Sequence, residues 1–208
     1  MRSRSWMTMA VALVLLAIAG GFLLGRAQAG GAGTLHGSLI DPPLAATDFV
    51  LASGDGPVAL SDFRGKVTVL FFGYTFCPDV CPYMLQRLRA ARDLLGPAGQ
   101  DVQVVFISVD PERDSPARTT AYARGFDPSF VGLSGSTPEV AAVASSFGIF
   151  YARAEPDRVA PDDAGEFYLV DHSATVLVLD RDGAIRLMWP GEASAEEMAG
   201  DLAWLLAN

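Results

Sequence analysis

Two cysteines and one histidine are the side chains of this sequence best suited to carry chemistry. Cys77 and Cys81 are its only cysteines, and they stand four positions apart in Cys-Pro-Asp-Val-Cys. His172 is one of two histidines and lies between apolar runs, in Tyr-Leu-Val-Asp-His-Ser. Thiolates and imidazoles bind metals and exchange protons or electrons. The three side chains therefore form a candidate site, provided that the fold brings them together.

The cysteine spacing admits three interpretations. An inert disulfide is one, although a bridge that closes so short a loop restricts the unfolded chain little. A redox dithiol is another, because a helix N-terminus lowers the pKa of a thiol, but thioredoxin-type pairs are separated by two residues and this pair by three. In the third, residues four apart project from the same side of one helical turn, with Cβ atoms roughly 5–6 Å apart, and hold a metal ion.

The other candidate ligands narrow the choice of metal. Soft thiolates favour Cu(I) or Zn(II), and imidazole suits both. A structural zinc site usually has four ligands, and His36 is the only further Cys or His in the chain. Three ligands of the Cys2His type are acceptable for copper and leave the site open for transfer. Met84 and Met188 are potential axial thioethers, but their places on an expected helix and strand favour core packing.

Runs of apolar residues predict the elements that must position this site. Val67–Gly73 is a continuous β-branched and aromatic run, typical of a strand buried on both faces, and Val102–Val109 is a second. Apolar residues at helical spacing predict a helix over Pro82–Leu95, directly after the cysteines. Further helix starts, each with a proline in the first turn, follow at Ser115 and Thr137.

The last part of the chain adds strands and a terminal helix. Strand-like pieces lie at 167–170 and 175–179, and Ile185–Met188 is expected as an edge strand. A capping box, Ser194 with Glu197, starts the final helix. Alternating strands and helices of this kind predict an α/β sandwich with a central mixed sheet. Because the cysteine pair stands between the first central strand and a helix, the arrangement indicates a thioredoxin-like fold.

The N-terminal residues predict a membrane anchor. Trp6–Leu24 carries no charge over 19 residues, enough to span roughly 28 Å as a helix. Arg2 and Arg4 precede this stretch, so the positive-inside rule predicts that the remainder of the chain is exported. The sequence 27–29, Ala-Gln-Ala, resembles a cleavage site, which leaves a removed signal peptide as the alternative.

The expected organisation is a single-pass protein of the cytoplasmic membrane. Its parts are an anchor or uncleaved signal at residues 1–26, a tether at 27–39 and the folded domain at 40–208. With the anchor oriented in this way, the domain lies in the periplasm or an equivalent extracytoplasmic space.

Composition excludes several classes of protein. The chain has 208 residues, a net charge of −9 and a mean hydropathy of +0.29. The first 26 residues hold three arginines and no acid, so without them 12 basic and 24 acidic residues remain, a net charge of −12. So acidic a domain is a poor nucleic-acid binder, since phosphate contacts need clustered Lys and Arg. An apolar content of 50% excludes disorder, and two cysteines are too few for a disulfide scaffold. Acids and prolines at 154–166 predict an exposed loop.

The residues around the cysteines resemble the copper-site motif of a known family. Gly73–Pro82, read as Gly-Tyr-Thr-Phe-Cys-Pro-Asp-Val-Cys-Pro, is similar to the metal-binding segment of the Sco/SenC proteins. Leu60–Lys66, Ser108–Asp114 and Val170–Ser173 also resemble that family, the last of them its segment with the copper-binding histidine. The likeness spans roughly residues 40–205.

The resemblance implies a fold, a cofactor and a partner. Sco/SenC proteins are membrane-anchored, thioredoxin-like copper metallochaperones of the mitochondrial inner membrane and the bacterial periplasm. By this likeness, Cys77, Cys81 and His172 bind one copper ion, as Cu(I) or Cu(II). The implied partner is the cytochrome c oxidase subunit that carries the binuclear copper A centre, and other periplasmic copper or thiol carriers are further candidates. Family members deliver copper to that centre or keep its cysteines reduced.

Two other functions remain open. A thiol:disulfide oxidoreductase would act through Cys77 and Cys81 without a metal, whereas a metallochaperone is not an enzyme. A redox or copper sensor would need only a surface that depends on the state of the site. Among the neighbours, Asp110 and Asp114 are expected to shape their loop rather than to contact a metal. Asp79 either tunes the local field or caps the helix.

Overall fold

The structure, a computed structural model, describes residues 35–154 and 168–208. The predicted anchor, most of the predicted tether and nearly all of the predicted acidic loop at 154–166 lie outside these residues. Within the two described ranges, no helix is both long and apolar enough to cross a membrane.

A mixed sheet forms the centre of the fold, as the sequence predicts. Its strand order is β1-β10-β9-β4-β5-β6, and two central strands, β4 (Val67–Gly73) and β5 (Val102–Ser108), run parallel. Every residue of β4 is buried, which explains its unbroken apolar sequence. β6 (Val131–Leu133) runs parallel to β5 at one edge. On the other side of β4 follow β9 (Val176–Leu179), β10 (Ala184–Trp189) and β1 (Ser38–Ala45), each antiparallel to the strand before it.

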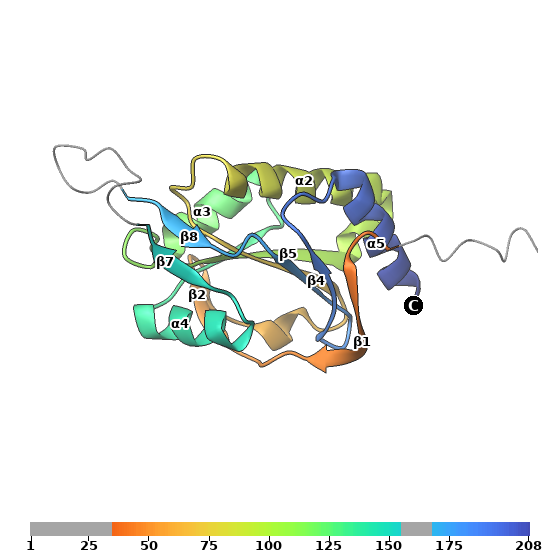
Figure 1. The fold of residues 1–208 in the computed structure, drawn as a ribbon, viewed down its shortest axis with the longest axis horizontal. Helices are drawn as coiled ribbons and strands as arrows, with labels where there is room; N and C mark the ends of the chain where they lie inside the picture. Colours follow the sequence, from red (N-terminus) through yellow and green to blue (C-terminus); the bar gives the residue numbers. More distant parts are fainter. Residues whose placement is uncertain (1–34, 155–167) are drawn as a thin grey trace, which may run out of the picture. The chain divides into compact units, whose positions relative to one another are not determined.

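Helices cover both faces of this sheet. They are α2 (Val80–Leu94), α3 (Pro116–Phe126), α4 (Thr137–Ser146) and α5 (Ala195–Ala207), with short 3-10 helices at Leu60–Phe63 and Gly96–Asp101. Because parallel crossovers are right-handed, α2 and α3, which lead from β4 to β5 and from β5 to β6, lie on one face. The chain then returns toward β9, and α4 covers the opposite face (Figure 1). The terminal α5 packs beside α2.

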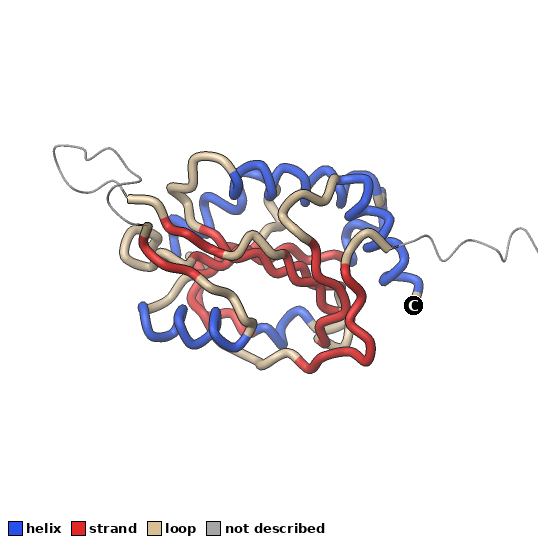
Figure 2. The backbone as a smooth tube through the Cα atoms, in the orientation of Figure 1, coloured by secondary structure: helices blue, strands red, loops and turns tan. Residues whose placement is uncertain are grey.

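Two small antiparallel pairs complete the structure. β2 (Val50–Ser53) pairs with β3 (Gly56–Ala59), and β7 (Tyr151–Arg153) pairs with β8 (Val170–His172). β7 and β8 lie side by side at one end of the domain that the structure describes, as the tube in Figure 2 shows. This end also holds the segment that follows β4.

Local sequence signals set the helix starts as predicted. The Ser115 hydroxyl accepts a hydrogen bond from the Arg118 N–H, and Pro116 follows as the first helical residue of α3. In α5, the Ser194 hydroxyl caps the Glu197 N–H while the Glu197 carboxylate accepts from the Ser194 N–H.

The prediction that 185–188 form an edge strand is wrong, because β1 pairs outside β10. β1 has no continuous apolar run, since an aspartate and two prolines interrupt it, and it is exposed along nearly all its length. A buried carboxylate, Asp201 of α5, fastens its start by accepting the N–H groups of His36 and Gly37 as well as the indole N–H of Trp189. The sheet therefore includes Ser38, within the stretch predicted as tether.

Candidate metal centre

The candidate site lies at the carboxyl end of β4. This strand pairs in parallel with β5 on one side and antiparallel with β9 on the other, so the start of β9 lies beside the end of β4. In open α/β sheets, ligands bind outside the carboxyl ends of the parallel strands. The two cysteines follow directly, between β4 and the first turn of α2.

The two cysteines do not share one helical turn, contrary to the spacing argument. α2 begins at Val80, with Asp79 as its non-helical N-cap residue at φ −141° and ψ −74°, so Cys77 precedes the helix. The residue before a proline is disfavoured in the α conformation, and Pro78 follows Cys77. The cysteines nevertheless meet, because the Cys81 N–H donates to the Cys77 Sγ over 3.4 Å. Asp79 occupies the cap position without a capping bond from its side chain.

Cys81 is fully buried against the end of β4. A Cβ atom on Gly73 would lie 2.6 Å from the Cys81 Sγ and 2.8 Å from the ring of Phe106, closer than such atoms approach. Glycine at the last position of β4 is therefore what allows the thiol to sit there. Sequence reasoning placed Gly73 in a motif but did not find this role.

His172 comes to the cysteines from β8, nearly a hundred residues later in the chain. Its Nε2 lies 3.7 Å from the Cys81 Sγ, and its Nδ1 lies 3.2 Å from the Val170 carbonyl oxygen. The tautomer with the proton on Nδ1 donates to that carbonyl and leaves the Nε2 lone pair facing the thiol, the arrangement found in metal-binding histidines. The buried Tyr74 ring meets the imidazole edge-on, with 5.7 Å between ring centroids.

The two thiols differ strongly in acidity. The pKa of Cys77 is lowered to about 5, first because the Cys81 thiol donates to its sulfur, and further by the backbone N–H groups of Asp79 and Cys81 and by His172. Burial acts against this shift. The pKa of Cys81 is raised, because it donates to Cys77 and is buried. Burial also raises the pKa of Tyr74 to about 12.

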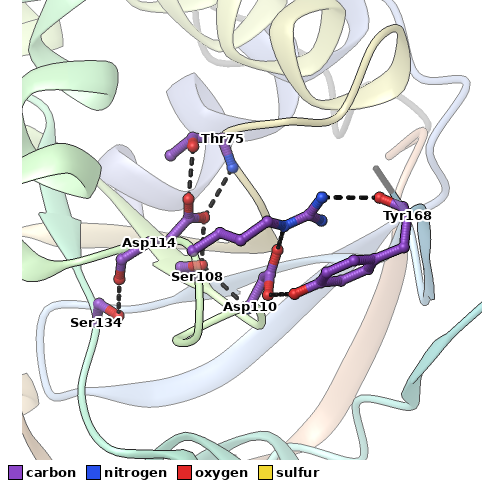
Figure 3. A network of polar contacts seen from close by, with 7 residues as sticks. Thr75, Ser108, Asp110, Asp114, Ser134 and Tyr168 are labelled. Atoms are coloured by element: carbon purple, nitrogen blue, oxygen red, sulfur yellow. Dashed lines mark hydrogen bonds and ion pairs between the residues drawn. The ribbon is translucent and has the colours of Figure 1, made fainter. Parts of the chain in front are cut away.

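A buried carboxylate holds the cysteine loop. Asp114 accepts hydrogen bonds from the Thr75 N–H at 2.8 Å, the Thr75 hydroxyl at 2.5 Å and the Ser108 hydroxyl at 2.6 Å, and its own carbonyl accepts from Ser134 (Figure 3). These bonds tie the residues just before Cys77 to the end of β5.

A second cluster on the same loop reaches the strand that carries His172. Asp110 accepts a 2.6 Å hydrogen bond from the Tyr168 hydroxyl and a 2.5 Å bond from the Arg113 Nε (Figure 3). Arg113 in turn donates to the Tyr168 carbonyl at 2.9 Å. Asp110 and Asp114 thus shape the loop after β5 through hydrogen bonds, as predicted.

The remaining candidates lie elsewhere. The His36 imidazole is 3.4 Å from the Glu197 carboxylate on α5. Met84 is buried in the core as predicted, but that prediction is wrong for Met188, which is 38% exposed on β10. Across the parts of the chain that the structure describes, no three His, Cys, Asp or Glu side chains already stand in a metal-binding arrangement. The Cys77 sulfur instead accepts hydrogen bonds from the Cys81 side chain and from the Cys81 N–H.

Comparison with known proteins places the chain in a family. The family model described as SCO1/SenC matches residues 38–207. A SCO2-like protein of Rickettsia conorii is 34% identical over 152 residues, which are 73% of this chain and 72% of that protein. The mitochondrial SCO2 homolog of Bos taurus is 38% identical over 154 residues, which are 73% of this chain but only 56% of the bovine protein.

Solved structures give the same result. The solution structure of apo Sco1 from Thermus thermophilus has 43% identity and a TM-score of 0.73, covering 84% of this chain and 99% of that one. Bradyrhizobium japonicum ScoI with copper bound has 36% identity and a TM-score of 0.67, covering 77% of this chain and 99% of that one.

The fold and the site define a thioredoxin-like protein with a dithiol and a histidine at the carboxyl edge of its sheet. The chain belongs to the SCO1/SenC family. The resemblance seen in the sequence is thereby confirmed, as is the predicted thioredoxin-like fold with a mixed sheet.

The unequal thiols predict a pH titration. In the reduced, metal-free chain, ultraviolet thiolate absorbance should rise with a midpoint near pH 5, the pKa of Cys77, and a Cys77→Ser variant should lack this step. Cys81→Ala should move the midpoint upward, because it removes the donor that lowers that pKa most. A first midpoint near the ordinary thiol value of about 8.5 would contradict the geometry.

Proposed function

We propose that this chain binds one copper ion through Cys77, Cys81 and His172. As a metallochaperone, it serves the assembly of the copper A centre of cytochrome c oxidase. The observation that carries the proposal is the 3.7 Å approach of the His172 Nε2 to the Cys81 Sγ, across 91 positions of sequence, beside the Cys77 sulfur. Solved relatives from Bradyrhizobium japonicum and yeast contain bound copper, which supports the choice of metal.

The donor set fits a copper ion. Two sulfurs and one imidazole nitrogen are soft or borderline ligands. Such ligands suit copper better than they suit magnesium or calcium. Cys77 is already inclined to be a thiolate, and the shielded site limits competition from water. Cys81 must lose its proton, so copper uptake should release at least one proton from this pair.

Copper titration of the reduced full-length chain tests the ligand set. We expect one tight site per chain, and its loss in Cys77→Ser, Cys81→Ser and, for Cu(II), His172→Ala. His36→Ala is the matched control, because His36 lies beside Glu197 on α5, and it should bind copper like the native chain. Unchanged Cu(II) binding in His172→Ala would refute the ligand assignment.

A second function, thiol:disulfide exchange, is favoured by the acidity difference between the two thiols. The Cys77 thiolate would attack a disulfide of the target and release one target thiol. The Cys81 sulfur would then displace the second target thiol, leaving a Cys77–Cys81 disulfide and a reduced target. No metal takes part, so His172→Ala should leave this exchange nearly unchanged.

Transfer assays separate the two functions. The chain loaded with one Cu(I) is mixed with a reduced copper A apoprotein, the two are separated, and copper in each is measured. We expect copper to move to the acceptor in proportion to the donor supplied. In a parallel assay, the metal-free reduced chain meets an acceptor with its cysteines oxidised. Reduction of that acceptor without any copper transfer in the first assay would favour the oxidoreductase instead.

The proposal includes an extracytoplasmic, membrane-attached placement. It is supported by the uncharged Trp6–Leu24 stretch and the two arginines before it. When the full chain is expressed in a bacterium, it should sediment with membranes, and its mass should show that the N-terminal segment is retained. Protease added to spheroplasts should digest the folded domain. A soluble periplasmic product that begins near Gly30 would instead indicate a cleaved signal peptide.

A further inference from the structure

Arg113 touches both halves of the proposed copper site. Its guanidinium carbon lies 4.8 Å from the ring centroid of Phe76, which immediately precedes Cys77. It also lies 3.5 Å from the ring centroid of Tyr168, four residues before His172. The side chain is 14% exposed, and its Nε is held by the nearly buried Asp110. Arg113 thus connects two segments that are distant in sequence, the one before Cys77 and the one before His172.

On the side of His172, Arg113 and Asp110 hold Tyr168 through hydrogen bonds. Arg113 donates to the Tyr168 carbonyl, and the Tyr168 hydroxyl donates to Asp110, so the backbone and the ring of Tyr168 are both fixed (Figure 3). From Tyr168 the chain runs straight into β8, whose last residue is His172. Among the strands that the structure describes, β8 pairs with the short β7 and not with the six-stranded sheet. The position of His172 therefore depends on contacts of this kind more than on the central sheet.

We propose that Arg113 is a positioning residue for the metal's third ligand. Together with Asp110 and Tyr168, it holds β8 so that the His172 imidazole reaches the Cys81 sulfur. This inference rests on the proposed copper site. It deepens that function, because it assigns control of the histidine to residues that would not contact the metal.

The chemistry of the two copper valences makes the role measurable. Cu(I) is satisfied by soft thiolates, whereas Cu(II) prefers nitrogen donors and a higher coordination number. Loosening His172 should therefore weaken Cu(II) binding far more than Cu(I) binding. Outer residues that orient a ligand typically change metal affinity by about 10–100-fold. A general loss of stability would not discriminate between the valences in this way.

Arg113→Met is the direct test, because it keeps the aliphatic bulk and removes the guanidinium. Arg118→Met is the matched control: Arg118 lies 5.0 Å from the Phe76 ring centroid, but its contacts do not include Tyr168 among those that the structure describes. Both are measured as full-length chains for Cu(I) and Cu(II) affinity. We expect Arg113→Met to lower Cu(II) affinity by about 10–100-fold with Cu(I) affinity nearly unchanged, and Arg118→Met to change neither.

Two further measurements keep the test decisive. Tyr168→Phe removes only the hydroxyl bond to Asp110 and should give a smaller loss of the same kind, which covers the case in which Arg113→Met does not fold. In the metal-free chain, the Tyr74 and His172 rings should show a nuclear Overhauser contact that Arg113→Met loses and Arg118→Met keeps. The proposal would be overturned if the ratio of Cu(II) affinity to Cu(I) affinity were the same in all variants, or if Arg113→Met kept the ring contact. Two results together would refute the copper function and leave the positioning role standing: the native chain binds no copper, and Arg113→Met still loses the ring contact.

Discussion

The buried carboxylate of Asp114 is the constraint on which the site depends. A carboxylate without exposure to water must be hydrogen-bonded, and here Thr75 and Ser108 supply the donors. Thr75 belongs to the segment between β4 and the cysteines, and Ser108 ends β5. These hydrogen bonds therefore fix the direction in which the chain leaves the sheet before it reaches Cys77. Removal of Asp114 would leave the donors of the half-buried Thr75 and the buried Ser108 without this partner.

The loop that contains Asp114 serves the whole site. Its first acid, Asp110, and its arginine, Arg113, hold Tyr168 and through it β8, while Asp114 holds the cysteine segment. One short loop after β5 thus supports ligands that come from the middle and from the last part of the chain. The unequal thiols have a separate, local cause. The Cys77 sulfur accepts hydrogen bonds from the Cys81 side chain and from the N–H groups of Asp79 and Cys81, which lowers its pKa, whereas Cys81 is fully buried against Gly73.

The sequence was informative where burial or a strict local rule decides the structure. The central strands, the capped helices and the convergence of Cys77, Cys81 and His172 were all predicted, because long apolar runs, prolines and a specific motif leave little choice. β1 was missed because its residues are exposed and its attachment depends on Asp201, which is distant in sequence. The contacts of Arg113 with both segments could not be predicted either, since only the folded chain brings Phe76 and Tyr168 to one guanidinium.

The central claim is that both cysteines and the histidine act on a single copper ion. X-ray absorption spectroscopy of the chain loaded with one Cu(II) tests it most directly, because it counts sulfur and imidazole neighbours. The account predicts two sulfur neighbours and one imidazole nitrogen contributed by His172, so that His172→Ala should lose the imidazole signal and His36→Ala should keep it. A copper ion with no sulfur neighbours, or with an imidazole signal that persists in His172→Ala, would contradict the account.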